Sequence, residues 1–187
     1  EYENEKTITF GNSNSFTISP PAIMALILGY LRTGDYRVKT ALSLPNNASY
    51  INQMLPDIIL LRTLGGLLVD EKQDSVFNFV VPDGLNQETL ASVVTGLSIA
   101  CGIKYAGTLN KKAFEKVHAI AKCLCLLEKT PFDFSRCNLL HREQYLSIVI
   151  LSCSLIIAGT CDVDFLRFVR YVRRRPISVN LTNCIYG

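Results

Sequence analysis

ACGIKYAGTLN, residues 100–110, decides the fold of this 187-residue chain. The stretch ends one apolar helical run at a Gly-Thr pair and begins a second run at once. Two other stretches, LILGYLRTGDY at 26–36 and LSCSLIIAGTCD at 151–162, have the same organisation. An arrangement that occurs three times in one chain indicates a structural repeat rather than a single active site.

Each stretch contains a glycine that is expected to end a helix. Glycine adopts the left-handed backbone conformation found after the last helical residue, which costs other residues about 1 kcal/mol or more. The polar residue after the glycine can supply an oxygen to the unpaired amides of the next helix. We therefore predict three turns of helical hairpins, formed by Gly34 and Asp35, by Gly107 and Thr108, and by Gly159 and Thr160.

A small residue lies five positions before each turn glycine: Gly29, Gly102 and Ser154. A small side chain allows a neighbouring helix to approach closely, so we expect these positions to lie where helices pack. Neighbouring hairpins then bury one another's apolar faces and stack into a solenoid.

The remaining sequence is also mostly helical. Helices are expected at about 20–33, 35–44, 49–55, 87–106, 110–127, 142–158 and 162–174, with a further apolar helix after Pro56 and an irregular connection at 70–84. Short β-like runs occur at 7–10, 15–18 and 177–181. The predicted fold class is all-α, an α-α superhelix with minor β-structure at the termini, in a single domain spanning residues 1–187.

The composition favours a piece of a larger assembly. Apolar residues make up 49% of the chain, which is enough for a sizeable core. Charged residues make up only 19%, so part of the surface is expected to face a partner or the rest of a longer chain. The chain opens on EYENEK without an initiator Met, which also suggests a piece of a longer protein.

Charge and cysteine usage favour an intracellular protein. A net charge of +3 indicates neither a nucleic acid nor a membrane as partner. The seven cysteines are an odd number and lie mostly in apolar helical runs, as reduced thiols of the cytoplasm or nucleus do. The apolar run at 145–161 has 17 residues and charged flanks, so a buried helix fits better than a membrane span.

No pattern in the sequence indicates catalysis or metal binding. Cys123 and Cys125 point in different directions on a helix and cannot both ligate one ion. A soluble helical enzyme with a cysteine nucleophile and His118 or His141 as base remains an alternative. Neither histidine lies in a recognisable nucleophile motif, and we expect no catalytic residue, no metal and no cofactor.

Two groups of arginines could mediate contacts. Arg62 lies in an apolar helix, where it is expected to pair with a carboxylate or reach solvent, or else to contact the next repeat or subunit. Arg167, Arg170 and Arg174 form one stripe of a helix whose opposite face is apolar. This stripe is interpreted as a solvated face, as a site for an acidic partner, or as a site for nucleic acid. The small net charge of the chain argues against nucleic acid.

The turns resemble the proteasome/cyclosome repeat, a helix rich in small residues that ends in Gly-Ser or Gly-Thr, often with Asn soon after. LSIACGIKYAGTLN has Asn110 at the expected place, and CSLIIAGTCD has Asp162 there. LGYLRTGDY departs from the pattern, with Asp35 at the Ser/Thr position and Arg37 where Asn would stand.

Two protein families contain such repeats: the large non-ATPase subunits of the proteasome regulatory particle, and the subunit 1 family of the anaphase-promoting complex (cyclosome). Two stretches are similar to the second family. They are ALSLPNNASYINQMLPDIILLRTLGGLL at 41–68 and IIAGTCDVDFLRFVRYVRRR at 156–175.

The resemblance implies a non-catalytic scaffold in a multisubunit ubiquitin ligase that controls mitotic progression, in the nucleus and cytoplasm. It implies contacts with a substrate-receptor subunit of the Doc fold, with the cullin subunit and with the remaining parts of the same chain. It implies no small-molecule substrate, no nucleic acid and no membrane.

Overall fold

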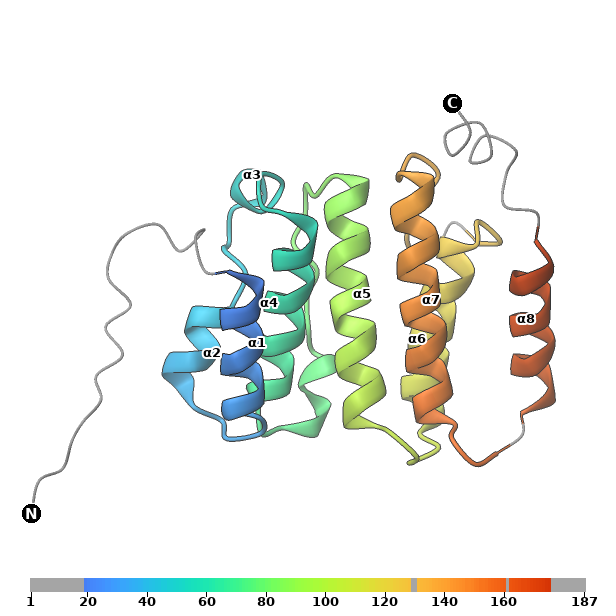
Figure 1. Ribbon diagram of the computed structural model, residues 1–187, viewed down its shortest axis with the longest axis horizontal. Coiled ribbons are helices and arrows are strands. Elements are labelled where there is room, and N and C mark those ends of the chain that lie inside the picture. Colours follow the sequence, from blue (N-terminus) through green and yellow to red (C-terminus); the bar gives the residue numbers. More distant parts are fainter. Residues whose placement is uncertain (1–18, 129–130, 161, 176–187) are drawn as a thin grey trace, which may run out of the picture.

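The computed structural model describes residues 19–128, 131–160 and 162–175, and these residues form α-helices with one short 3-10 helix and no strand (Figure 1). The all-α fold class is therefore confirmed. The β-like runs expected at 7–10, 15–18 and 177–181 lie outside the described residues. The helices are α1 Pro20–Gly29, α2 Tyr36–Leu42, α3 Ala48–Ile51, α4 Pro56–Val69, the 3-10 helix η1 Gln73–Val76, α5 Gln87–Lys104, α6 Lys111–Leu124, α7 Leu139–Ile156 and α8 Val163–Arg174.

Most helices begin at a residue whose side chain accepts hydrogen bonds from the free amides of the first turn. These capping residues are Asp35, Asn47, Asn86, Asn110, Asn138 and Asp162. α1 and α4 begin instead with proline, which needs no amide partner there. The cap at Asn138 explains why α7 begins at Leu139, three residues before the predicted start at 142.

The first helices of successive hairpins lie side by side in one row. α4 packs against α1 and α5, and α5 packs against α7, so the row runs α1, α4, α5, α7 (Figure 1). Of the second helices, α2 packs on α4 and α6 packs on α7, whereas α8 lies at the end of the row beyond α7 (Figure 1). The structure is thus a stack of helical hairpins, as the three turns predict.

The second hairpin lacks its second helix. After α4 the chain forms η1 and an irregular connection, as expected for residues 70–84. The Lys104 ammonium at the end of α5 holds this connection by donating to the carbonyls of Asp70 and Lys72, at 3.1 and 2.6 Å. The Tyr105 hydroxyl donates to the Asp74 carboxylate at 2.8 Å. These polar contacts replace the packing that a helix would provide.

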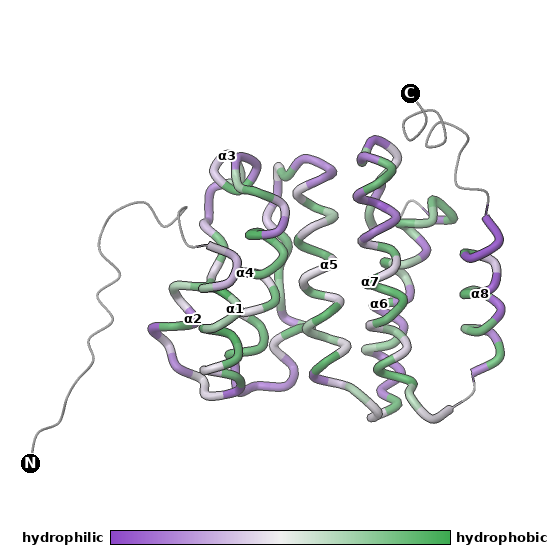
Figure 2. Tube along the Cα trace, viewed as in Figure 1, coloured by the Kyte–Doolittle hydropathy of each residue, from purple (hydrophilic) through white to green (hydrophobic). Residues whose placement is uncertain are grey.

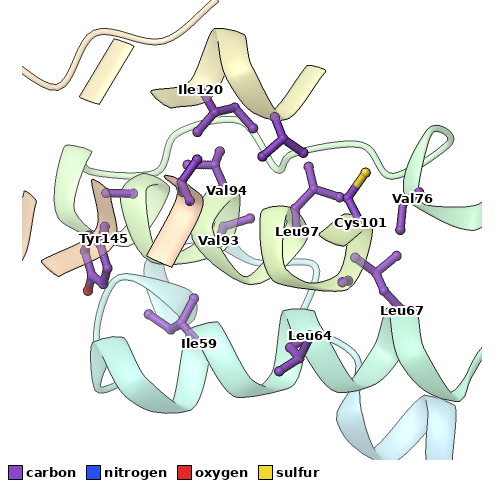
Figure 3. Close-up of a cluster of buried hydrophobic side chains, with 14 of the residues drawn as sticks. Ile59, Leu64, Leu67, Val76, Val93, Val94, Leu97, Cys101, Ile120 and Tyr145 are labelled. Carbon is purple, nitrogen blue, oxygen red and sulfur yellow. The ribbon is translucent and has the colours of Figure 1, made fainter. Parts of the chain in front are cut away.

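α5 is the centre of the core. Its side chains Val93, Val94, Leu97 and Cys101 lie between α4, α6 and α7 (Figure 3). Three of its buried hydroxyl residues each donate to the carbonyl four residues earlier: Ser92, Thr95 and Ser98. Because α5 is covered on several sides, it has no polar face, whereas α8 at the end of the row is hydrophilic on one side (Figure 2).

α4 and α5 approach each other closely at Gly96. A Cβ atom built on Gly96 would lie 2.6 Å from the Leu60 carbonyl oxygen and 2.9 Å from Cβ of Thr63. Neither contact can relax by rotation of a flexible side chain. A glycine is therefore required at this crossing, whereas a Cβ on Gly66 of α4 would meet only the Leu42 carbonyl at 3.8 Å.

We predict that Gly96→Ala destabilises the chain by about 1–3 kcal/mol, since it overpacks the crossing of α4 and α5. Gly66→Ala is the matched control, because the added methyl group fits and alanine favours the helix by up to about 1 kcal/mol. Thermal unfolding of both variants measures the difference. Equal midpoints for Gly96→Ala and Gly66→Ala would contradict the close approach.

Candidate functional site

The three turns predicted from the sequence share one geometry. In each turn a threonine hydroxyl donates to the carbonyl three residues earlier, at 2.8–2.9 Å; these are Thr33, Thr108 and Thr160. Two residues later an acidic or amide side chain caps the next helix; these are Asp35, Asn110 and Asp162. The turns are therefore equivalent at their threonines and at their caps.

This equivalence corrects the alignment of the first turn. Thr33 corresponds to Thr108, so Arg32 with φ +57° stands where Gly107 with φ +67° stands. Gly34, at φ +68°, corresponds to Leu109, at φ +57°, rather than to Gly107 and Gly159. The sequence alignment of the first turn on glycine is wrong by two residues, because a non-glycine residue adopts the left-handed conformation in each of these two turns, Arg32 in the first and Leu109 in the second.

The turns connect successive hairpins through the backbone. The amides of Arg32 and Gly34 donate to the last carbonyls of α4, those of Leu68 and Val69, at 3.0 and 2.9 Å. In the same way, the amides of Gly107 and Leu109 donate to the last carbonyls of α7. The acceptors there are Leu155 and Ile156, at 2.8 and 3.2 Å. We call this pair of bonds the two-amide clamp; it satisfies carbonyls that have no partner within their own helix.

The predicted close-packing residues behave differently from one another. A Cβ on Gly102 would lie 2.9 Å from Cα of Ser152, so α5 and α7 do approach closely there. A Cβ on Gly29 would meet no atom of the described residues within 4 Å, so the close packing expected at Gly29 is not found. Ser154 is half-buried and donates its hydroxyl to the Ile150 carbonyl at 2.9 Å.

The described cysteines are poor nucleophiles. Cys101, Cys125 and Cys153 are buried free thiols. Burial raises the pKa of Cys101 and Cys125 to about 11 and that of Cys153 to about 12. Thiols with such pKa values carry little thiolate at neutral pH, so this environment does not favour the alternative of a Cys/His enzyme. The described part of the chain contains no cluster of His, Cys, Asp or Glu side chains suited to a metal ion.

His118 belongs to an aromatic contact between α6 and α8. Its ring centroid lies 4.8 Å from that of Phe168, 5.2 Å from that of Phe114 and 5.9 Å from that of Phe165. Burial, together with the nearby Lys122, lowers the pKa of His118 below its usual value of 6.5. His118 therefore packs between α6 and α8 and is neutral at physiological pH.

Arg62 of α4 is only 3% exposed. Burial lowers the pKa of its guanidinium group. A cavity of about 560 Å³ lies beside it, lined by residues of α2, of α4 and of the irregular connection. The cavity lies where the second hairpin lacks its second helix, and apolar and charged residues of both signs line it.

Arg167, Arg170 and Arg174 are all exposed on α8, and we call them the α8 arginine stripe. Arg167 forms an ion pair with Asp164 of the same helix at 3.0 Å. Phe165 on the other side of α8 is only 4% exposed. The stripe therefore faces away from the core and is exposed to solvent.

Arg175 was not predicted as a contact residue. It donates to the Glu143 carboxylate of α7 and, at 3.3 Å, to the Cys125 carbonyl after α6. It thereby ties the end of α8 to both helices of the array. The sequence offers no signal that separates Arg175 from the other arginines of the RRR run.

Comparison with known proteins gives one consistent result. The family model described as "APC1 fifth domain" matches residues 1–187. The chain is 32% identical over 183 residues to anaphase-promoting complex subunit 1 of Schizosaccharomyces pombe, 26% over 213 residues to that of Arabidopsis thaliana and 24% over 229 residues to that of Dictyostelium discoideum. These matches cover 87%, 94% and 94% of this chain. They cover 12%, 13% and 10% of the relatives, so the chain spans about a tenth of the length of the curated relatives that it matches.

No helix in the described ranges, 19–128, 131–160 and 162–175, combines the length and the apolar character that crossing a membrane requires.

We predict that Gly107→Val destabilises the chain by more than about 1 kcal/mol, because a β-branched residue is strained at φ +67° and the strain acts on the two-amide clamp. Gly29→Val is the control, since Gly29 is helical and its surroundings are open. Thermal melting measures both. An unchanged melting midpoint for Gly107→Val would show that this turn does not contribute to the stability of the fold.

We predict that acid weakens the docking of α8 through His118. The pKa of His118 in the folded chain is lowered, so the unfolded chain binds a proton more readily, and stability falls as the pH falls below about 6.5. The His118→Phe variant should lack the part of the stability loss that arises from protonation of His118. Melting midpoints of the two proteins between pH 7.5 and about 5 measure the effect, and parallel pH profiles would contradict it.

Proposed function

Because the chain belongs to the APC1 fifth domain family, whose curated relatives are subunit 1 of the anaphase-promoting complex, we propose that it is a non-catalytic scaffold segment of that complex. The complex is a ubiquitin ligase that controls mitotic progression, and we place the segment in the nucleus and cytoplasm. The family match favours this host over the proteasome regulatory particle.

The observation that carries the proposal is the two-amide clamp. The motif that the sequence repeats, Gly-Thr followed by a capping residue, uses its backbone amides to join one hairpin to the next, while its side chains bond locally within the turn and at the start of the following helix. A repeated motif with this role builds a rigid, extended surface and leaves none of its groups for chemistry on a substrate. The high pKa values of the buried thiols support the same interpretation.

The α8 arginine stripe is the surface that we propose for docking a neighbour. It belongs to α8, the helix at the end of the row (Figure 1), and its three arginines are exposed. The apolar side of the same helix is occupied by contacts with Phe114 and His118. An acidic surface of a neighbouring subunit fits this charge, and the Doc-fold substrate-receptor subunit and the cullin subunit are the proposed neighbours, beside other parts of the same chain.

We predict that replacing Arg167, Arg170 and Arg174 together by Ser weakens incorporation of the full-length subunit into the complex while its melting curve stays nearly unchanged. Exposed charges contribute about 0–1 kcal/mol each to stability, whereas truncation of a desolvated interface arginine costs about 2 kcal/mol or more. Recovery of the other subunits with the tagged variant measures incorporation, at increasing salt. The difference in subunit recovery between the variant and the wild type should become smaller as salt screens the charges.

A control variant replaces Arg37, Lys72 and Lys111 by Ser, which removes the same charge from exposed positions elsewhere. Normal recovery of the complex by the stripe variant at low salt would show that the stripe is only a solvated face. Unfolding of that variant would show instead that the arginines are structural.

A further inference from the structure

The connection between α4 and α5 contains a stretch with the pattern of a β-strand. Over FNFVV, residues 77–81, the first, third and fifth side chains are half-buried, and the second and fourth are exposed. The half-buried side chains pack against the core, whereas Val80 is 83% exposed, more than any other large apolar side chain of the described residues. Alternation with a period of two is typical of an extended strand that lies with one face on a core.

The course of the chain also requires an extended conformation here. α4 has 14 residues, so it is about 21 Å long. From η1, near the end of α4, the connection returns along α4 to the start of α5 (Figure 1). Only residues 77–86 are available for this return. As a helix they would span about 15 Å, whereas an extended chain of this length spans up to about 33 Å.

The backbone of this stretch is available for pairing. No backbone hydrogen bond within the described residues uses the amide or the carbonyl of Phe79, Val80 or Val81. The carbonyls on either side of the stretch, those of Val76 and Gly84, accept hydrogen bonds from side chains of other segments at 2.9 and 3.2 Å. The stretch is therefore held at both ends and open between them. An extended segment with unpaired backbone groups is a surface to which a second strand can add.

A groove runs beside this stretch. It is the cavity of about 560 Å³ near Arg62, and Phe79 and Val80 line it together with residues of α2 and α4. Leu44, Leu67 and further apolar side chains form part of its wall. Its volume lies within the range of about 300–1,000 Å³ that is usual for ligand sites. The open backbone and the cavity thus form one concave surface, which we call the second-hairpin groove.

The charges of the second-hairpin groove favour an acidic occupant. Positive and negative side chains line it, namely Lys39, Arg62, Lys72, Asp70 and Asp74. Both carboxylates have partners, because the Lys39 ammonium lies 2.6 Å from Asp70 and a tyrosine hydroxyl donates to Asp74 at 2.8 Å. Lys72 is exposed and forms no ion pair with a described residue. The groove therefore has an excess of positive charge, which attracts a carboxylate.

We propose that the second-hairpin groove binds an extended, acidic segment of another subunit of the complex. The segment adds a strand to residues 79–81 and places a carboxylate near Lys72. Backbone hydrogen bonds supply affinity in this mode of binding, and alternate side chains of the added strand meet Val80 and the apolar wall of the groove. A helix does not fit the open backbone, because the amides and carbonyls of a helix interior are already paired.

Another subunit is the source to which the proposal commits. Hairpins of a solenoid contact their neighbours in the row, so further hairpins of the same chain add at its two ends. The groove lies at neither end, since α2, α4 and the connection to α5 form it. The proposal rests on the proposed function, because it takes this segment to be part of that complex.

The first test is a cross-link from the full-length subunit within the purified complex. A photoreactive amino acid replaces Val80, and mass spectrometry identifies the peptides that are joined to it by light. The expected product is a peptide of another subunit that contains Asp or Glu. Tyr36, which is 78% exposed and does not line the groove, is the control position. The same product from position 36, a product with the same chain or a second copy, or no product would overturn the proposal.

Hydrogen exchange in the complex is the second test. The peptide of residues 77–82 should exchange slowly, because its amides are paired, and Val80→Asp should speed this exchange about tenfold or more, because the new charge repels an acidic segment. Val80→Thr is the matched control, since it keeps a β-branched side chain and adds no charge. Melting curves check that both variants fold. Fast exchange in the wild type, or equal exchange in the two variants, would contradict the added strand.

Recovery of the other subunits with the tagged chain separates the two proposals. A complex that assembles normally but gives no cross-link from position 80 counts against the second-hairpin groove alone. A wild-type chain that recovers no other subunit counts against the scaffold function.

Discussion

The two-amide clamp is the interaction on which the array depends. In two turns, amides two residues apart donate to consecutive carbonyls at the end of the following first helix. Such carbonyls have no donor within their own helix, and burying one without a partner costs about 1–3 kcal/mol. The clamp therefore fixes both the axial position of each helix and the distance to its neighbour. Because its donors are backbone groups, it requires a left-handed turn and no particular side chain.

The second hairpin shows what happens where the clamp is absent. At the end of α5 a side chain takes the place of backbone donors: the side-chain amide of Gln73 donates to the Lys104 carbonyl at 3.2 Å. The Lys104 ammonium in return donates to Asp70, Lys72 and the Ser75 hydroxyl. These bonds hold an irregular segment in place of a helix. With the irregular segment in place of a helix, α4 and α5 still lie in the row. The cavity beside Arg62 lies where a packed second helix would fill the space.

Much of this organisation could be predicted from the sequence, because it depends on interactions between residues that are close together in the chain. Pro20, Pro56 and the Asn and Asp caps set the helix starts, and the apolar runs set their lengths. The register of the first turn could not be predicted, because Arg32 and Leu109 adopt positive φ without being glycine. Nor could the roles of Gly96 and Arg175, since each depends on a contact with a residue far away in the chain.

The position of α8 follows from contacts of a different kind. Where α7 is held by backbone bonds from the preceding turn, α8 meets the array through the rings of Phe165 and Phe168 and through Arg175. Ring contacts of this kind are each worth about 0.5–1.5 kcal/mol beyond the area they bury, so α8 is held less firmly than the helices of the row. The aromatic residues must face α6, which obliges the α8 arginine stripe to face outward. A partner that binds the stripe would therefore also stabilise the last hairpin, because it would bind α8 only in its docked position.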